Sequence, residues 1–103
     1  MNKGLLSRLV IHEILLTLKK NFSTYDEVFA RKIKEYSLDT AEKKFIHNVT
    51  LTSLRNNFII KEIIDAYSNK KKLTINQYLI LLSGINQLIF LNIKEYAVIF
   101  TMV

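Results

Sequence analysis

The chain has 103 residues, half of them hydrophobic, and a mean hydropathy of +0.15, which excludes a disordered chain and predicts one domain over residues 1–103. It contains no cysteine, so disulfides, thiolate metal sites and cysteine nucleophiles are excluded. The formal net charge of +6 favours an anionic partner, with nucleic acid ahead of a membrane surface. The alternative is a lysine-rich surface that is merely solvated.

No stretch is long and apolar enough to predict a membrane span, which needs roughly 18 residues. The most apolar region, Leu79 to Ile93, is interrupted by serine, asparagine and glutamine. Near the N-terminus, the apolar run is cut by Arg8, His12 and Glu13, which is not typical of a signal peptide. We therefore expect a cytoplasmic protein with no membrane partner.

The absence of proline and the presence of only two glycines leave few helix breakers, so the apolar spacing predicts an all-α bundle. We expect five helices with short loops, followed by a short C-terminal apolar segment. The first helix is expected from about Leu5 to Lys20, with Asn21 ending it. Its apolar side chains gather on one side at about 100° per residue: Leu6, Val10, Ile11, Ile14, Leu15 and Leu18.

The second helix is expected to begin after Ser23 and Thr24, whose hydroxyls suit a helix N-terminus. Asp26 and Glu27 follow in its first turn, where negative charge is favourable. Its predicted buried stripe consists of Tyr25, Val28, Phe29, Ile33 and Tyr36.

The third helix opens with Asp39 and Glu42, which have the spacing of a capping box. Its core candidates are Phe45, Ile46, Val49 and Leu54, and the pair Asn56-Asn57 is expected to bend or break it. A fourth helix follows and ends at the polar run 68–72. Its apolar face is predicted to contain Ile60, Ile63, Ile64 and Tyr67, with Ile59 beside them.

The fifth helix, expected to continue to about Leu91, has the clearest start. Thr74 and Gln77 form a capping box, and Leu73 and Tyr78 occupy the two hydrophobic staple positions. Because this helix is apolar almost all round, we expect it at the centre of the bundle, where Gly84 would permit close approach of a neighbour.

The candidate binding residues are basic. On the first helix, Arg8, His12 and Lys19 project within about 40° of one another and, with Lys3, predict a stripe that binds RNA phosphates. A solvated helix flank is the alternative. The further candidates are Arg55 with Asn56 and Asn57 at the end of the third helix, where helix capping by the two asparagines is the alternative. The loop residues Lys70, Lys71 and Lys72 are also candidates, with a polar turn as the alternative.

Residues for catalysis are not recognisable in the sequence. His12 and Glu13 are adjacent and therefore point in different directions on a helix, and His47 has only Lys43 and Lys44 near it on its face. No Gly-rich phosphate loop, metal-ligand spacing or nucleophile motif is present. We therefore expect a protein that is not an enzyme and that needs no cofactor or metal.

Three segments together resemble the NusB-type domain. They are Ser7-Arg8-Leu9-Val10, Thr52-Ser53-Leu54-Arg55-Asn56-Asn57, and the run from Leu81 to Ile93 with Gly84 and Gln87 in it. The family includes a transcription antitermination factor, which holds single-stranded leader RNA together with a small-subunit ribosomal protein. It also includes the N-terminal RNA-binding domain of an rRNA cytosine-5 methyltransferase, which the third-helix junction resembles more.

The resemblance implies a NusB-like RNA-binding module without catalysis, in which Arg8, Lys3 and His12 match the RNA-contacting region. Ribosomal or transcription-factor proteins are the implied protein partners. The alternative is a protein-interaction module that forms a homodimer or binds a partner helix, including a phage-encoded or remnant mimic of a host protein.

Several positions depart from the family pattern: Leu82 replaces an arginine, Asn86 an aromatic residue, Lys94-Glu95 a proline turn and Phe100-Thr101 an asparagine-glutamate pair. The family's two closing helices are also lacking. The apolar residues at the C-terminus are therefore expected to fold back into the bundle or to cross into a partner chain: Val98, Ile99, Phe100 and Met102.

Overall fold

The computed structural model describes residues 3–21, 23–67, 72–91 and 93. These residues form five α-helices and one π-helix, with no strand among them, so the predicted all-α fold is confirmed. The elements are α1 (Lys3–Lys20), α2 (Tyr25–Glu35), α3 (Thr40–Arg55), α4 (Asn57–Tyr67), α5 (Ile75–Ile85) and the π-helix η1 (Asn86–Phe90).

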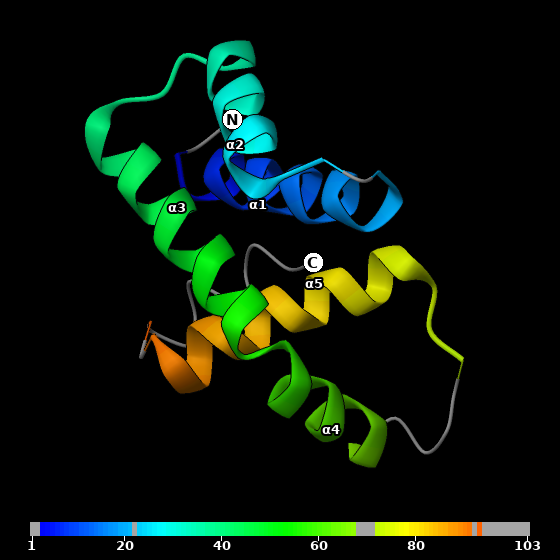
Figure 1. The fold of residues 1–103 in the computed structure, drawn as a ribbon. Coiled ribbons are helices and arrows are strands. Elements are labelled where there is room, and N and C mark those ends of the chain that lie inside the picture. The colour runs from blue at the N-terminus through cyan, green and yellow to red at the C-terminus, as the bar shows by residue number, and fades with distance from the viewer. Residues whose placement is uncertain (1–2, 22, 68–71, 92, 94–103) are drawn as a thin grey trace.

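Figure 1 shows α1 lying between α2 and α5, with α3 running along one side of them. The helix α3 contacts α1, α5 and η1, while α4 packs against α5 at the edge of the bundle. The two ends of the described chain therefore meet, because α1 lies against α5 and α5 leads directly into η1.

The core is built mainly from one face of α1. Val10, Ile11, Ile14 and Leu15 are buried, and Leu6 and Leu18 pack against them, so the predicted apolar face of this helix is confirmed. The other buried apolar side chains come from every remaining α-helix: Val28, Ile46, Val49, Ile60, Ile64, Leu79 and Leu82.

Helix starts follow the predicted caps. The hydroxyl of Thr24 accepts a hydrogen bond from the backbone N–H of Glu27 and begins α2. Complete capping boxes begin α3 at Asp39 and α5 at Thr74. Each cap satisfies backbone donors that have no partner within the helix, which is why the starts can be located from sequence.

Three predicted core positions on α3 and α4 are wrong. Leu54 is 40% exposed, Tyr67 is 84% exposed, and Ile59 is exposed as well. The reason is geometric: α3 ends at Arg55, and α4 restarts at the edge of the bundle, where a neighbour covers only one narrow face. That face carries Ile60 and Ile64.

The fifth helix also differs from its prediction, because α-helical geometry ends at Ile85 and a π turn continues to Phe90. The N–H of Leu91 donates to the carbonyl of Asn86 over 3.1 Å, a five-residue spacing that defines this wider turn. The fifth element is therefore buried mainly along one side, and Ile89 and Phe90 remain exposed.

Candidate functional site

Arg8 is held by contacts within the fold. Its Nε donates to Oε1 of Gln87 over 2.9 Å, and its Nη1 donates to the carbonyl of Gly4 over 3.1 Å. The guanidinium carbon also lies 5.1 Å from the ring centroid of Phe45. Partial burial lowers the pKa of Arg8 from its ordinary value. Arg8 therefore joins α1 to α3 and η1, besides facing solvent in part.

His12 and Lys19 turn toward α5. The Nε2 atom of His12 and Oδ1 of Asn76 share a hydrogen bond of 3.0 Å, and Nζ of Lys19 lies 5.9 Å from the ring centroid of Tyr78. The structure thus places His12 and Lys19 on the side of α1 that α5 covers, whereas Arg8 contacts η1 and α3. Lys3 belongs to the first turn of α1, but its side chain lies outside the described part.

The remaining predicted site residues are scattered. Arg55 is exposed in the last turn of α3, and Lys72 is exposed before α5, so neither extends the stripe. Lys70 and Lys71 lie outside the described residues. The same is true of the expected partner segment: Val98, Ile99, Phe100 and Met102.

A shallow pocket of about 310 Å³ opens beside Arg8, between the first half of α1 and the start of α3. Its lining includes Phe45 and the two carboxylates of the capping box, Asp39 and Glu42. The cation and the carboxylates give the pocket mixed charge, which makes it a poor site for an isolated anion. The pocket therefore does not form a phosphate cradle.

Asn86 forms the buried polar centre of the bundle. Its Nδ2 donates to Oγ1 of Thr52 over 2.8 Å and to the carbonyl of Val49 over 3.3 Å, while Nδ2 of Asn56 donates to its Oδ1 over 3.2 Å. A buried amide with these partners links η1 to the end of α3 and to the break before α4.

Gln87, the next residue, completes the support of Arg8. Its Nε2 donates to the carbonyl and to Oγ of Ser83, over 3.2 and 3.1 Å, which leaves Oε1 free to accept from Arg8. The two consecutive amides are both buried in the π turn. Gln87 was predicted only as part of a family motif, and its contact with Arg8 could not be predicted because the two residues are 79 positions apart.

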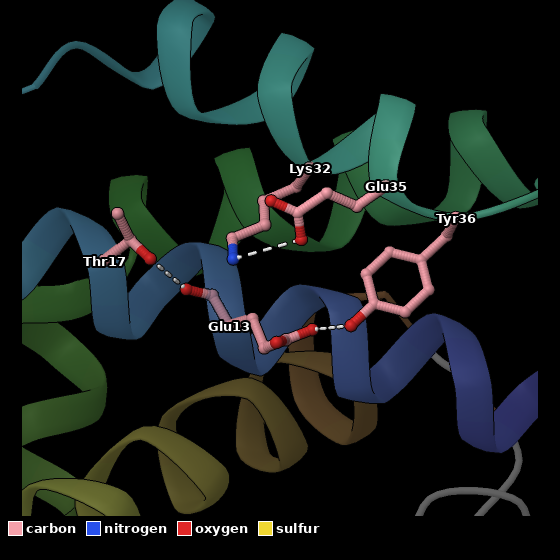
Figure 2. Close-up of polar contacts among 5 residues, drawn as sticks. All are labelled: Glu13, Thr17, Lys32, Glu35 and Tyr36. Carbon is pink, nitrogen blue, oxygen red and sulfur yellow. Dashed lines mark hydrogen bonds and ion pairs between the residues drawn. The ribbon is translucent and has the colours of Figure 1, made fainter.

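The contact between α1 and α2 includes a strong polar pair. Figure 2 shows the hydroxyl of Tyr36, at the end of α2, donating a short hydrogen bond to the carboxylate of Glu13 on α1. This bond, with burial and the Glu13 charge, raises the pKa of Tyr36 to about 12. Nearby, Lys32 and Glu35 form an ion pair of 3.5 Å. The Tyr36–Glu13 bond joins the end of α2 to α1, whereas the Lys32–Glu35 pair lies within α2.

A ring cluster that was not predicted from the sequence consists of Tyr25 and Phe29 on α2 and His47 on α3. The ring centroids are 5.3 to 5.7 Å apart. The hydroxyl of Tyr25 and Nδ1 of His47 share a hydrogen bond of 2.9 Å. Burial, followed by the charge of Asp26, raises the pKa of Tyr25 to about 12, so the hydroxyl keeps its proton at neutral pH.

The exposed edge of this cluster is basic. His47 is exposed, and Lys43 and Lys44, one turn earlier on α3, are exposed too. The signal available in the sequence was the four-residue spacing of Tyr25 and Phe29, followed by a lysine pair one turn before a histidine. That these two patterns meet depends on the α2–α3 pairing.

Within the described residues, no group of three or more histidine, aspartate or glutamate side chains is placed to hold a metal ion. None of the helices described combines the length and the apolar character that crossing a membrane requires.

No protein-family model, curated protein or solved structure matches this chain. The resemblance to the NusB-type domain therefore stays a prediction.

Proposed function

We propose that the protein is a non-catalytic, NusB-like module that binds single-stranded or ribosomal RNA in transcription antitermination or ribosome-related assembly. The observation that supports RNA binding best is that more of the acidic than of the exposed basic side chains have charged or hydrogen-bonding partners within the protein. Among the described residues, five of the eight carboxylates take part in a helix cap, a hydrogen bond from a tyrosine or an ion pair, whereas only one of the nine exposed lysine and arginine side chains takes part in an ion pair.

The carboxylates have identifiable structural roles. Asp39 and Glu42 form a capping box, and Glu13 accepts the hydrogen bond from Tyr36. Glu35 and Asp65 belong to ion pairs with lysines of their own helices. Negative charge at these positions is therefore partly neutralised within the molecule.

The basic side chains are distributed differently. In the described part of the chain, Lys61 is the only exposed cation that takes part in an ion pair. The other exposed cations are Lys19, Lys20, Arg31, Lys34, Lys43, Lys44, Arg55 and Lys72. Such a surface attracts a polyanion, and phosphate contacts supply most of the affinity of RNA-binding modules for their ligands.

The test measures the affinity for RNA at several salt concentrations, using the fluorescence anisotropy of a labelled single-stranded oligonucleotide. Affinity should be highest near 50 mM salt and fall steeply toward about 200 mM, with a log–log slope of about −0.7 for each phosphate contacted. Negligible binding at the lower salt concentration would contradict the proposal.

A pair of lysine variants sharpens this test. Lys43→Gln removes an exposed cation outside any described ion pair, so the slope should become shallower by about 0.7. Lys61→Gln is the matched control, because the charge of Lys61 already lies 3.3 Å from Asp65. Equal effects of the two substitutions would count against specific use of the solvent-facing lysines.

The alternative function, a protein-interaction module, is favoured by a different observation. Large apolar side chains are exposed at the start of α4, where Phe58 is 75% exposed and Ile59 is exposed beside it. Exposed apolar patches of this kind often mark interfaces. Light scattering that shows a monomer, together with no binding of a dye for exposed apolar surface, would contradict this alternative.

A further inference from the structure

The ring cluster has an inner and an outer part. Tyr25 and Phe29 are half-buried and pack against the core, whereas the imidazole of His47 lies at the exposed side. An aromatic ring whose back is supported by the protein and whose front is open to solvent is the arrangement on which RNA-binding modules stack unpaired bases.

Two contacts fix the orientation of the His47 ring. Its Nδ1 shares the 2.9 Å hydrogen bond with the hydroxyl of Tyr25. The ring of Phe29 meets it nearly edge-on, with an interplanar angle of 77° and a centroid distance of 5.3 Å. Because the ring is held before any ligand arrives, stacking on it costs less conformational entropy than stacking on a freely rotating side chain.

Positive charge lies next to this ring. Lys43 and Lys44 precede His47 by four and three residues, so their Cβ atoms share its side of α3 at a spacing of roughly 5–6 Å. Both lysines are exposed, and neither belongs to an ion pair within the described residues. A nucleotide with its base on the ring would place its phosphates within reach of the two ammonium groups.

We infer that His47 is a base-stacking residue that holds one unpaired base of a single-stranded RNA, while Lys43 and Lys44 bind the adjoining phosphates. The identity of the polymer rests on the function proposed above. Tyr25 is a positioning residue here, because it acts through the imidazole. Duplex RNA does not satisfy this geometry, since its bases are already stacked on one another.

The test compares His47→Ala with His47→Phe, using a labelled single-stranded oligouridine of about eight nucleotides and a duplex RNA of the same length. Loss of stacking in His47→Ala should weaken single-strand binding by roughly 5- to 150-fold, whereas His47→Phe keeps an aromatic face and should stay within about twofold of wild type. Duplex binding, which uses phosphates alone, should not change in either variant.

Lys34→Ala serves as the surface control, because Lys34 is exposed on α2 about 180° around the helix from Tyr25. It should lower single-strand and duplex affinity to the same small extent. Tyr25→Phe keeps the ring but removes its hydrogen bond to His47, so it should weaken single-strand binding less than His47→Ala.

The outcomes separate the inference from the proposed function. Tight, salt-dependent binding of wild type that His47→Ala leaves unchanged would overturn the stacking role and leave RNA binding intact. No binding by wild type at low salt would overturn both. If polyglutamate binds as tightly as the oligouridine, and His47→Ala weakens both equally, the surface recognises charge on a polypeptide and the stacking role is also overturned.

Discussion

At the scale of single residues, two consecutive amides, Asn86 and Gln87, join η1, whose apolar side chains lie outside the core cluster, to α3 and α1. Asn86 joins η1 to the end of α3, and Gln87 carries Arg8 of α1. Interior amides are costly to bury unless their partners are complete, so these contacts specify one arrangement of the helices more strictly than interchangeable apolar contacts do.

Replacing Asn86 tests this role. Asn86→Leu keeps the number and branching of the side-chain heavy atoms but removes the donor to Oγ1 of Thr52 and the acceptor for Nδ2 of Asn56, so the free energy of unfolding should fall by about 1–3 kcal/mol. Urea denaturation followed by circular dichroism measures the change. Asn48→Leu, at an exposed position of α3, is the matched control and should stay within about 0.5 kcal/mol of wild type.

Ionisation of Tyr36 is expected to lower the stability of the folded protein at alkaline pH. Its pKa is about 12 in the folded protein, above the ordinary value of 10.0, mainly because its protonated hydroxyl donates a hydrogen bond to the carboxylate of Glu13. A raised folded pKa means that the stabilisation is fully present below pH 10 and is lost as the pH rises toward 12.

The substitution Tyr36→Phe should therefore destabilise the protein at neutral pH and flatten the decline of stability between pH 10 and 12. Thermal unfolding at a series of pH values, compared with wild type, measures both effects. The same alkaline slope in the two proteins would show that ionisation of Tyr36 is not linked to folding.

At the scale of elements, the helix starts were predictable because each depends on residues three positions apart. Thr24, Asp39 and Thr74 all act as the sequence indicates. The end of α5 was not predictable in this way. Whether the chain continues as an α-helix or a π-helix after Ile85 depends on where Asn86 and Gln87 find partners, and those partners come from distant helices.

The start of α5 offers a test at this scale. Thr74→Ala removes the acceptor for the N–H of Gln77 and should lower the free energy of unfolding by about 0.5–2 kcal/mol, as measured by urea denaturation. Thr40→Ala is the control, because Thr40 is exposed just after the cap residue of α3. If both substitutions lowered the free energy of unfolding by a similar amount, the effect of Thr74→Ala could not be attributed to the capping box.

At the scale of the whole molecule, angular spacing predicted which residues share a helix face but not what covers that face. The apolar face of α1 was predicted correctly, because a helix with six apolar residues on one side buries that side in a bundle and leaves the polar side exposed. On the short helix α4 the same reasoning failed for Ile59 and Tyr67, because α4 packs mainly against one helix, α5, and the residues that face away from α5 stay exposed.

For the candidate site too, the grouping of residues on one helix was predictable, but the contacts between helices were not. Spacing placed Arg8, His12 and Lys19 on one side of α1. In the structure His12 and Lys19 contact α5, whereas Arg8 contacts η1 and α3. The ring cluster could not be found from one helix alone, since Tyr25 and His47 meet only through the pairing of α2 with α3. Residue types are local information, and contacts between helices are not.

The bond between Arg8 and Gln87 has a consequence for synthesis of the chain. The two residues are 79 positions apart, which corresponds to roughly 4–16 s of translation at typical elongation rates. During that interval α2 and α3 can already associate with α1, while the side of α1 that belongs to α5 has no cover. The side of α1 that α5 covers therefore remains exposed to solvent until α5 has been synthesised.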